Sequence, residues 1–179
     1  MKEVTIQAAM RAANVKAAKA KVMRIKPLRR SLKDWFDHKG RCPFPAIHDF
    51  GVWVELMLDF MGDMIHNDGL ETADNYVAAL RVQSMGDPLA LKCARQLEKK
   101  GVQTDIDCYV EEGMVYASVW LKHRVIDHVN KLAEEVAGKF REKGYSVDVW
   151  TDEEDSSEVT VNAVIDFDKF AELLKKGGQ

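Results

Sequence analysis

The sequence is poor in cysteine and proline, with three and four residues among 179. An odd number of cysteines without paired spacing argues against a disulfide framework and favours a reducing compartment such as the cytoplasm. No apolar run approaches the roughly 18 residues that cross a membrane, because acids interrupt even the most apolar window, Phe50–Ile65. The first residues also lack the apolar core and cleavage site of a secretory peptide. We therefore expect no membrane partner.

Motifs that announce catalysis are missing as well. The sequence contains no phosphate loop, dinucleotide glycine fingerprint, paired-cysteine zinc spacing, metalloprotease histidine pair, nucleophile elbow or kinase signature. It is nevertheless 46% hydrophobic and 31% charged, which is enough apolar material to form a folded core. These features favour a globular binding protein without a cofactor over an enzyme.

The net charge of −3 hides two opposite parts. Residues 11–41 contain 11 basic and 2 acidic side chains, whereas residues 42–179 carry a net charge of −12. A basic N-terminal arm on an acidic body indicates a partner that is anionic.

The arm is predicted to be helical over residues 5–25 and again over 28–36, with Pro27 at the break. The basic residues of the first helix do not share one face, which argues against a membrane-surface helix. Residues 40–45 (GRCPFP) are predicted to form an extended connector, because a residue before proline avoids the helical region. We interpret the basic side chains as contacts to nucleic-acid phosphates or to an acidic protein surface; pairing with the chain's own acids is the alternative. The candidates are Arg11, Lys16, Lys19, Lys21, Arg24, Arg29, Arg30 and Lys33.

A second helix-rich region follows, with one long helix predicted over residues 46–66. That helix is apolar on most sides, which indicates burial against several neighbours. Its polar residues form one stripe, because their spacing places them on a common face. The acidic members and the last histidine could form a carboxylate metal site. A solvated helix edge is the simpler explanation and is favoured, because metal sites are rarer than solvated faces. The metal candidates are Glu55, Asp59, Asp63 and His66.

The C-terminal half contains an internal repeat, since residues 90–107 align with 133–150 at an offset of 43. Each copy reads as a helix, a glycine stop and two strands with period-two alternation. Asp87 is predicted to be the N-cap of the first helix of the repeat, and Pro88 follows it at the first helical position. With a last helix over 168–176, the predicted order is αββαββα. We expect an α+β fold in which a four-stranded, mainly antiparallel sheet carries its helices on one face.

The outer face of that sheet is predicted to carry aromatic side chains among acids. An aromatic sheet face is typical of base stacking, but these acids would repel phosphates. The face therefore favours a protein partner, another copy of the chain, or cover by the N-terminal helices. The aromatic residues are Tyr109, Tyr116, Trp120 and Trp150.

The predicted organisation is a basic arm with its connector (1–44), an apolar helical region (45–86) and the duplicated domain (87–179). The leading hypothesis is a non-enzymatic binding or assembly protein, such as a subunit of a viral or ribonucleoprotein assembly, that docks through its basic arm; a homo-oligomer stays open. Two alternatives come from other classes. The acidic hairpin 152–155, with Glu111 and Glu112, would suit an inhibitor that imitates nucleic acid, and the acidic stripe would suit a metal-dependent hydrolase.

Overall fold

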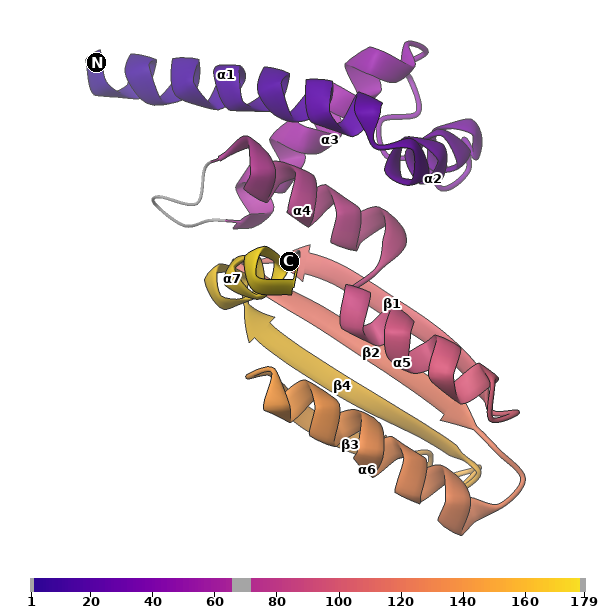
Figure 1. The fold of residues 1–179 in the computed structure, drawn as a ribbon. Helices are drawn as coiled ribbons and strands as arrows, with labels where there is room; N and C mark the ends of the chain where they lie inside the picture. The colour runs from indigo at the N-terminus through magenta and orange to yellow at the C-terminus, as the bar shows by residue number, and fades with distance from the viewer. Residues whose placement is uncertain (1, 66–71, 178–179) are drawn as a thin grey trace. The chain divides into compact units, whose positions relative to one another are not determined.

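The computed structural model describes residues 2–65 and 72–177, which divide into two compact units (Figure 1). The helical unit is Met1–Met85, and the α+β unit is Gly86–Gln179. Within the described ranges, no helix combines the length and the apolar character that a membrane crossing requires.

The helical unit consists of four helices in the residues described. These are α1 (Lys2–Arg24), α2 (Lys26–Asp37), α3 (Phe50–Ile65) and α4 (Ala73–Met85). Both α1 and α2 pack against α3 and α4, and the four share one hydrophobic core. Trp53 of α3 is fully buried there, and its indole N–H donates to the Pro43 carbonyl at 2.6 Å. Trp35 of α2 likewise donates to the Arg41 carbonyl at 2.9 Å, so both tryptophans hold the connector.

Close packing between α3 and α4 depends on Gly62. A Cβ atom at this position would lie 2.5 Å from the Tyr76 ring, whose side chain is fully buried. The two helices can therefore approach at this point only because residue 62 has no side chain.

The helix predicted over residues 46–66 begins later in the structure than the sequence indicated. Helix α3 begins at Phe50, because the Asp49 carboxylate accepts a hydrogen bond from the Val52 N–H at 2.8 Å and caps the first turn. The predicted end at His66 lies outside the described residues.

The α+β unit confirms the predicted order αββαββα. Its elements are α5 (Pro88–Glu98), β1 (Gln103–Glu111), β2 (Met114–Lys122), α6 (Ile126–Glu142), β3 (Ser146–Thr151), β4 (Glu158–Asp166) and α7 (Phe167–Gly177). The sheet is antiparallel throughout, in the order β1-β2-β4-β3. The two hairpins meet at β2 and β4, where Val119 lies opposite Val161. This arrangement places the repeats about a pseudo-twofold axis.

Helices α5, α6 and α7 all lie on one face of this sheet, as Figure 1 shows. Alternate residues of the central strands β2 and β4 point into that layer and are buried. Asp87 caps α5 as predicted, because its carboxylate accepts from the Leu89 and Ala90 N–H groups at 2.7 and 3.0 Å. Its second oxygen accepts from the Tyr145 hydroxyl at 2.7 Å, which ties the first repeat to the second.

Candidate nucleic-acid interface

Helix α2 presents two opposite faces. Leu28, Leu32 and Phe36 recur every four residues and are buried in the core of the helical unit. The other face carries four cations at spacings of 3, 1 and 3 residues, which place them in one stripe along the helix. We call them the α2 cations: Lys26, Arg29, Arg30 and Lys33.

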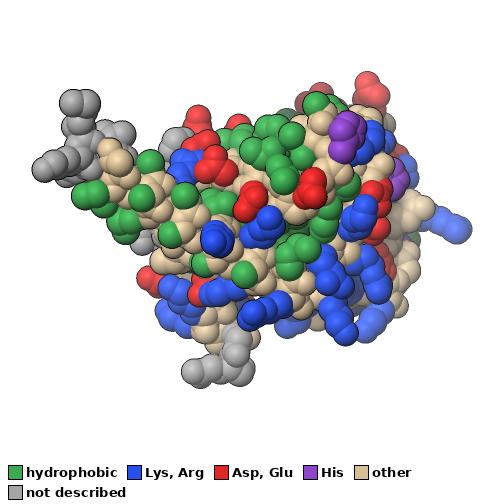
Figure 2. All heavy atoms as spheres, turned by 90° about the horizontal axis from the view of Figure 1, so that it is seen from above, with side chains coloured by type: hydrophobic (Ala, Val, Ile, Leu, Met, Phe, Trp, Pro, Cys, Tyr) green, Lys and Arg blue, Asp and Glu red, His purple; other side chains and the backbone are tan. Residues whose placement is uncertain are grey.

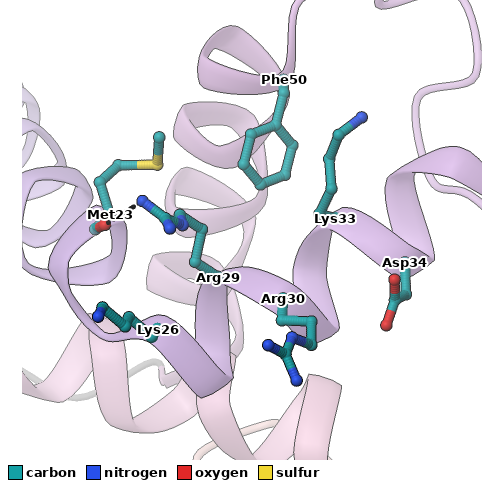
Figure 3. A pocket seen from close by; sticks show the side chains of 7 residues that line it. All are labelled: Met23, Lys26, Arg29, Arg30, Lys33, Asp34 and Phe50. Atoms are coloured by element: carbon teal, nitrogen blue, oxygen red, sulfur yellow. Dashed lines mark hydrogen bonds between the residues drawn. The ribbon is translucent and has the colours of Figure 1, made fainter.

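The α2 cations line an open pocket of about 380 Å³ in the helical unit (Figure 3). Met23 and Phe50 form its apolar part, and Asp34 is the one acid in the lining. In Figure 3 the Phe50 side chain projects from α3 toward the space between Arg29 and Lys33. The pocket therefore combines an excess of positive charge with an aromatic wall.

Phe50 is held in place by its own neighbours. Its ring lies edge-on to Phe36, with centroids 5.5 Å apart, and near-parallel to Trp53 at 6.2 Å. The Lys33 ammonium lies 5.7 Å from the Phe50 centroid, within cation–π range. Lys33 also pairs with Asp37 at 2.6 Å, so its charge is partly compensated.

Several cations predicted as nucleic-acid contacts are paired with acids of their own unit. Arg11 contacts Asp59 and Asp63, each at 2.7 Å. Hydrogen bonds to these carboxylates, that to Asp63 first, raise the pKa of Arg11 above its ordinary value. Lys19 pairs with Glu55 at 3.2 Å, and Lys21 pairs with Asp74 at 2.6 Å.

The remaining cations of the basic segment have exposed side chains and no acidic partner among residues 2–65 and 72–177. On α1 these are Lys16 and Arg24, on α2 they are Lys26, Arg29 and Arg30, and after α2 they are Lys39 and Arg41. The Arg29 guanidinium donates to the Met23 carbonyl, at 3.3 Å. Figure 2 shows Lys and Arg side chains gathered at the lower right of the view, on the side where α2 lies. The uncompensated charge is thus concentrated at the α1–α2 junction, along α2 and just after it.

Four residues of the pocket lining were missed by the sequence prediction: Met23, Lys26, Asp34 and Phe50. Lys26 and Phe50 both line the pocket, yet neither was a candidate contact. The spacing of Lys26 to Arg29, Arg30 and Lys33 is a helical stripe that could have identified it. Phe50 offers no comparable signal, because it joins the pocket only through the packing of α3 on α2.

The acidic stripe predicted on the long helix lies against α1. Glu55, Asp59 and Asp63 are the carboxylates that pair with Lys19 and Arg11. Among the described residues no group of three histidine, cysteine or acidic side chains has the arrangement of a metal site. His66, the fourth candidate, lies outside the described residues.

The predicted aromatic face is in the α+β unit. Tyr109 and Tyr116 stack across β1 and β2, with centroids 4.7 Å apart and planes 12° from parallel. Trp120 is half-buried and donates its indole N–H to Glu158 at 3.3 Å, whereas the Trp150 side chain is 69% exposed.

Two carboxylates of the acidic hairpin 152–155 are engaged in contacts within the α+β unit. Asp152 accepts from the Glu154 and Asp155 N–H groups, each at 2.8 Å, which closes the turn. Hydrogen bonds from Ser157 and then Lys122 lower the pKa of Asp155 to about 2. These contacts shape the hairpin, and Glu153 and Glu154 are the exposed acids whose carboxylates take no part in them.

The chain matches no protein-family model, no curated protein and no solved structure. A proposal for its function rests on the geometry of the site.

Proposed function

We propose that the protein binds nucleic acid, with a preference for single strands, through the α2 cations of the helical unit. The observation that supports this proposal is the pocket in which Lys26, Arg29 and Arg30 have no acidic partner among the described residues. Three like charges held close together on one short helix repel each other. A polyanion that bridges them removes that repulsion and releases its own counterions.

The shape of the pocket favours a single strand over a duplex. A duplex presents its phosphates on a regular surface with the bases stacked inside, so an aromatic wall next to the cations has nothing to contact. A single strand can place a phosphate on Arg29 or Arg30 and turn a base or sugar toward Met23 and Phe50. Contacts of this kind do not depend on base sequence, and we expect little sequence preference.

The experiment is the anisotropy of a labelled single-stranded oligonucleotide titrated with wild-type protein and two variants. The test variant is R29Q/R30Q, which removes two exposed charges without touching the core. We expect its affinity to fall roughly tenfold, or about 0.7 kcal/mol for each cation. A duplex of the same sequence should bind more weakly than the single strand to wild type.

The matched control is R95Q/R124Q, which removes two exposed arginines from the α+β unit. It has the same change in net charge, so it accounts for the overall field of the protein. Equal affinity of R29Q/R30Q and R95Q/R124Q would contradict the assignment of the site to α2.

A further inference from the structure

The second surface of interest is the face of the sheet that α5, α6 and α7 leave uncovered in the α+β unit. The register places Asp105, Trp120, Thr160 and Trp150 in one row across β1, β2, β4 and β3. A neighbouring row contains Asp107, Ser118, Asn162 and Asp148. Tyr109 and Tyr116 lie one row further on, where they stack. Aromatic rings and carboxylates therefore alternate over a single open surface, which we call the acidic sheet face.

The aromatic side chains on the acidic sheet face include exposed surface that a partner could contact. Trp150 is the most exposed of the large hydrophobic residues in the part of the chain that the structure describes. A surface tryptophan at the edge of an aromatic group is typical of the anchors of protein interfaces.

The charge of the face is strongly negative. Asp105, Asp107 and Asp148 are exposed. Lys122 lies one row beyond Trp120 on the same face, where it is bound by Asp155 and Glu158. The pKa of Tyr109 is raised, first by burial and then by Glu111, which places an acid next to the stacked rings. A partner with arginines or lysines would therefore gain both carboxylate pairs and cation–π contacts on this face.

We propose that α2 of a second copy of the chain docks on the acidic sheet face. The exposed stripe of α2 runs from Lys26 to Lys33, about 10 Å along the helix axis. The four strands span about 14 Å from β1 to β3, and successive rows lie about 7 Å apart. Arg29 and Arg30 can thus reach one row of acids while Lys26 and Lys33 reach its neighbours. This inference goes beyond nucleic-acid binding and does not depend on it, because it needs only the two complementary surfaces.

Such a contact is head-to-tail, since the two copies use different surfaces. Each copy that donates its α2 still has an open sheet face, so copies can continue to add unless the rotation closes a ring. The association should weaken with salt, because its ion pairs lie at an exposed surface.

The test is sedimentation velocity of the full chain from low to high micromolar concentration at low salt. Wild type should show species larger than a monomer that grow with concentration and shrink with salt. R29Q/R30Q removes two cations of the docking helix, and D107N/D148N removes two acids of the receiving face. Each should associate at least tenfold more weakly than wild type. The matched controls R95Q/R124Q and E153Q/E154Q change exposed charges elsewhere in the α+β unit and should associate like wild type.

Mixing the two variants distinguishes head-to-tail association from association through two identical surfaces. R29Q/R30Q retains an intact sheet face and D107N/D148N retains an intact α2, so an equimolar mixture should form a heterodimer and stop there. Wild type that stays monomeric at every concentration would overturn the proposal. Association that survives in either variant would also overturn the proposal. If R29Q/R30Q still associates, the sheet face pairs with something other than α2; if D107N/D148N still associates, α2 docks elsewhere. Circular dichroism of each variant establishes that loss of association is not loss of folding.

Discussion

At the scale of single residues, the basic segment contains two kinds of cation. Arg11, Lys19 and Lys21 contact acids of α3 and α4, where they compensate charge inside the helical unit. Lys26, Arg29 and Arg30 have no such partner among the described residues and line the pocket. We expect the first kind to contribute to stability and propose that the second binds nucleic acid. Substitutions of the first kind should therefore lower Tm, and substitutions of the second kind should lower the binding affinity.

Arg11→Gln tests the first kind. It removes a guanidinium that pairs with two carboxylates and also donates to the Asp59 carbonyl. Because the carboxylates are half-exposed, we expect a loss of about 1 kcal/mol in the free energy of unfolding. For a chain of this size that loss lowers Tm by about 2–4 °C, which differential scanning calorimetry can measure.

The control for Arg11→Gln is Lys16→Gln, which removes an exposed charge from the same helix. It should leave Tm unchanged. If the two substitutions lower Tm equally, the ion pairs of Arg11 contribute nothing beyond overall charge.

The sequence alone predicts the excess of cations in residues 11–41 but not which of them are paired. Arg11 and Asp59 lie 48 residues apart, so their contact exists only after α1 packs on α3. The face of α1 that meets α3 depends on that packing, and no local pattern specifies it.

At the scale of secondary structure, local signals determine the backbone at some positions and not at others. The extended connector predicted for residues 40–45 is wrong, because this segment forms turns and Phe44, between two prolines, has φ of +56°. Gly144, placed as a left-handed stop after the second repeat helix, has φ of +87°. Asp87 caps α5 with two hydrogen bonds, as an aspartate before proline indicates. The predicted start of α3 was too early, because the apolar spacing of a helix already begins within residues 46–49. In the structure the Asp49 side chain caps the helix, so that α3 begins at Phe50.

Asp87 also makes a contact that no sequence pattern indicates. Its side chain is fully buried and accepts from the Tyr145 hydroxyl, which joins the start of α5 to the residue before β3. Burial, and then the nearby Asp87 carboxylate, raise the pKa of Tyr145. The hydrogen bond links the two repeats.

Tyr145→Phe should destabilise the α+β unit by about 2 kcal/mol, because it leaves one oxygen of a buried carboxylate without its donor. Hydrogen exchange of the most protected amides in β2 and β4 measures this unit separately from the helical one. Tyr116→Phe, on the acidic sheet face, is the matched control and should have little effect. Equal protection in both variants would mean that water or a rearranged donor satisfies Asp87.

At the scale of the whole molecule, the uneven distribution of charge along the chain corresponds to two surfaces of opposite sign. The α2 cations are in the helical unit, and the acidic sheet face is in the α+β unit. The α+β fold and the repeat could be predicted because periodicity and glycine position are local. The pocket could not, since Met23, Phe50 and the α2 cations come together only through helix packing.

The two proposals share α2, which has a consequence for the molecule. A nucleic-acid strand and the sheet face of a second copy would compete for the same cations. Bound nucleic acid would thus favour separate copies, and free protein would favour association.

The most direct test of the central claim is the salt dependence of single-stranded binding by wild type and R29Q/R30Q. Each phosphate contact contributes about 0.7 to the slope of log affinity against log salt for a single strand. If Arg29 and Arg30 contact phosphates, the double substitution should make this slope shallower by about 1.4. An unchanged slope would show that the strand is bound elsewhere and would contradict the account.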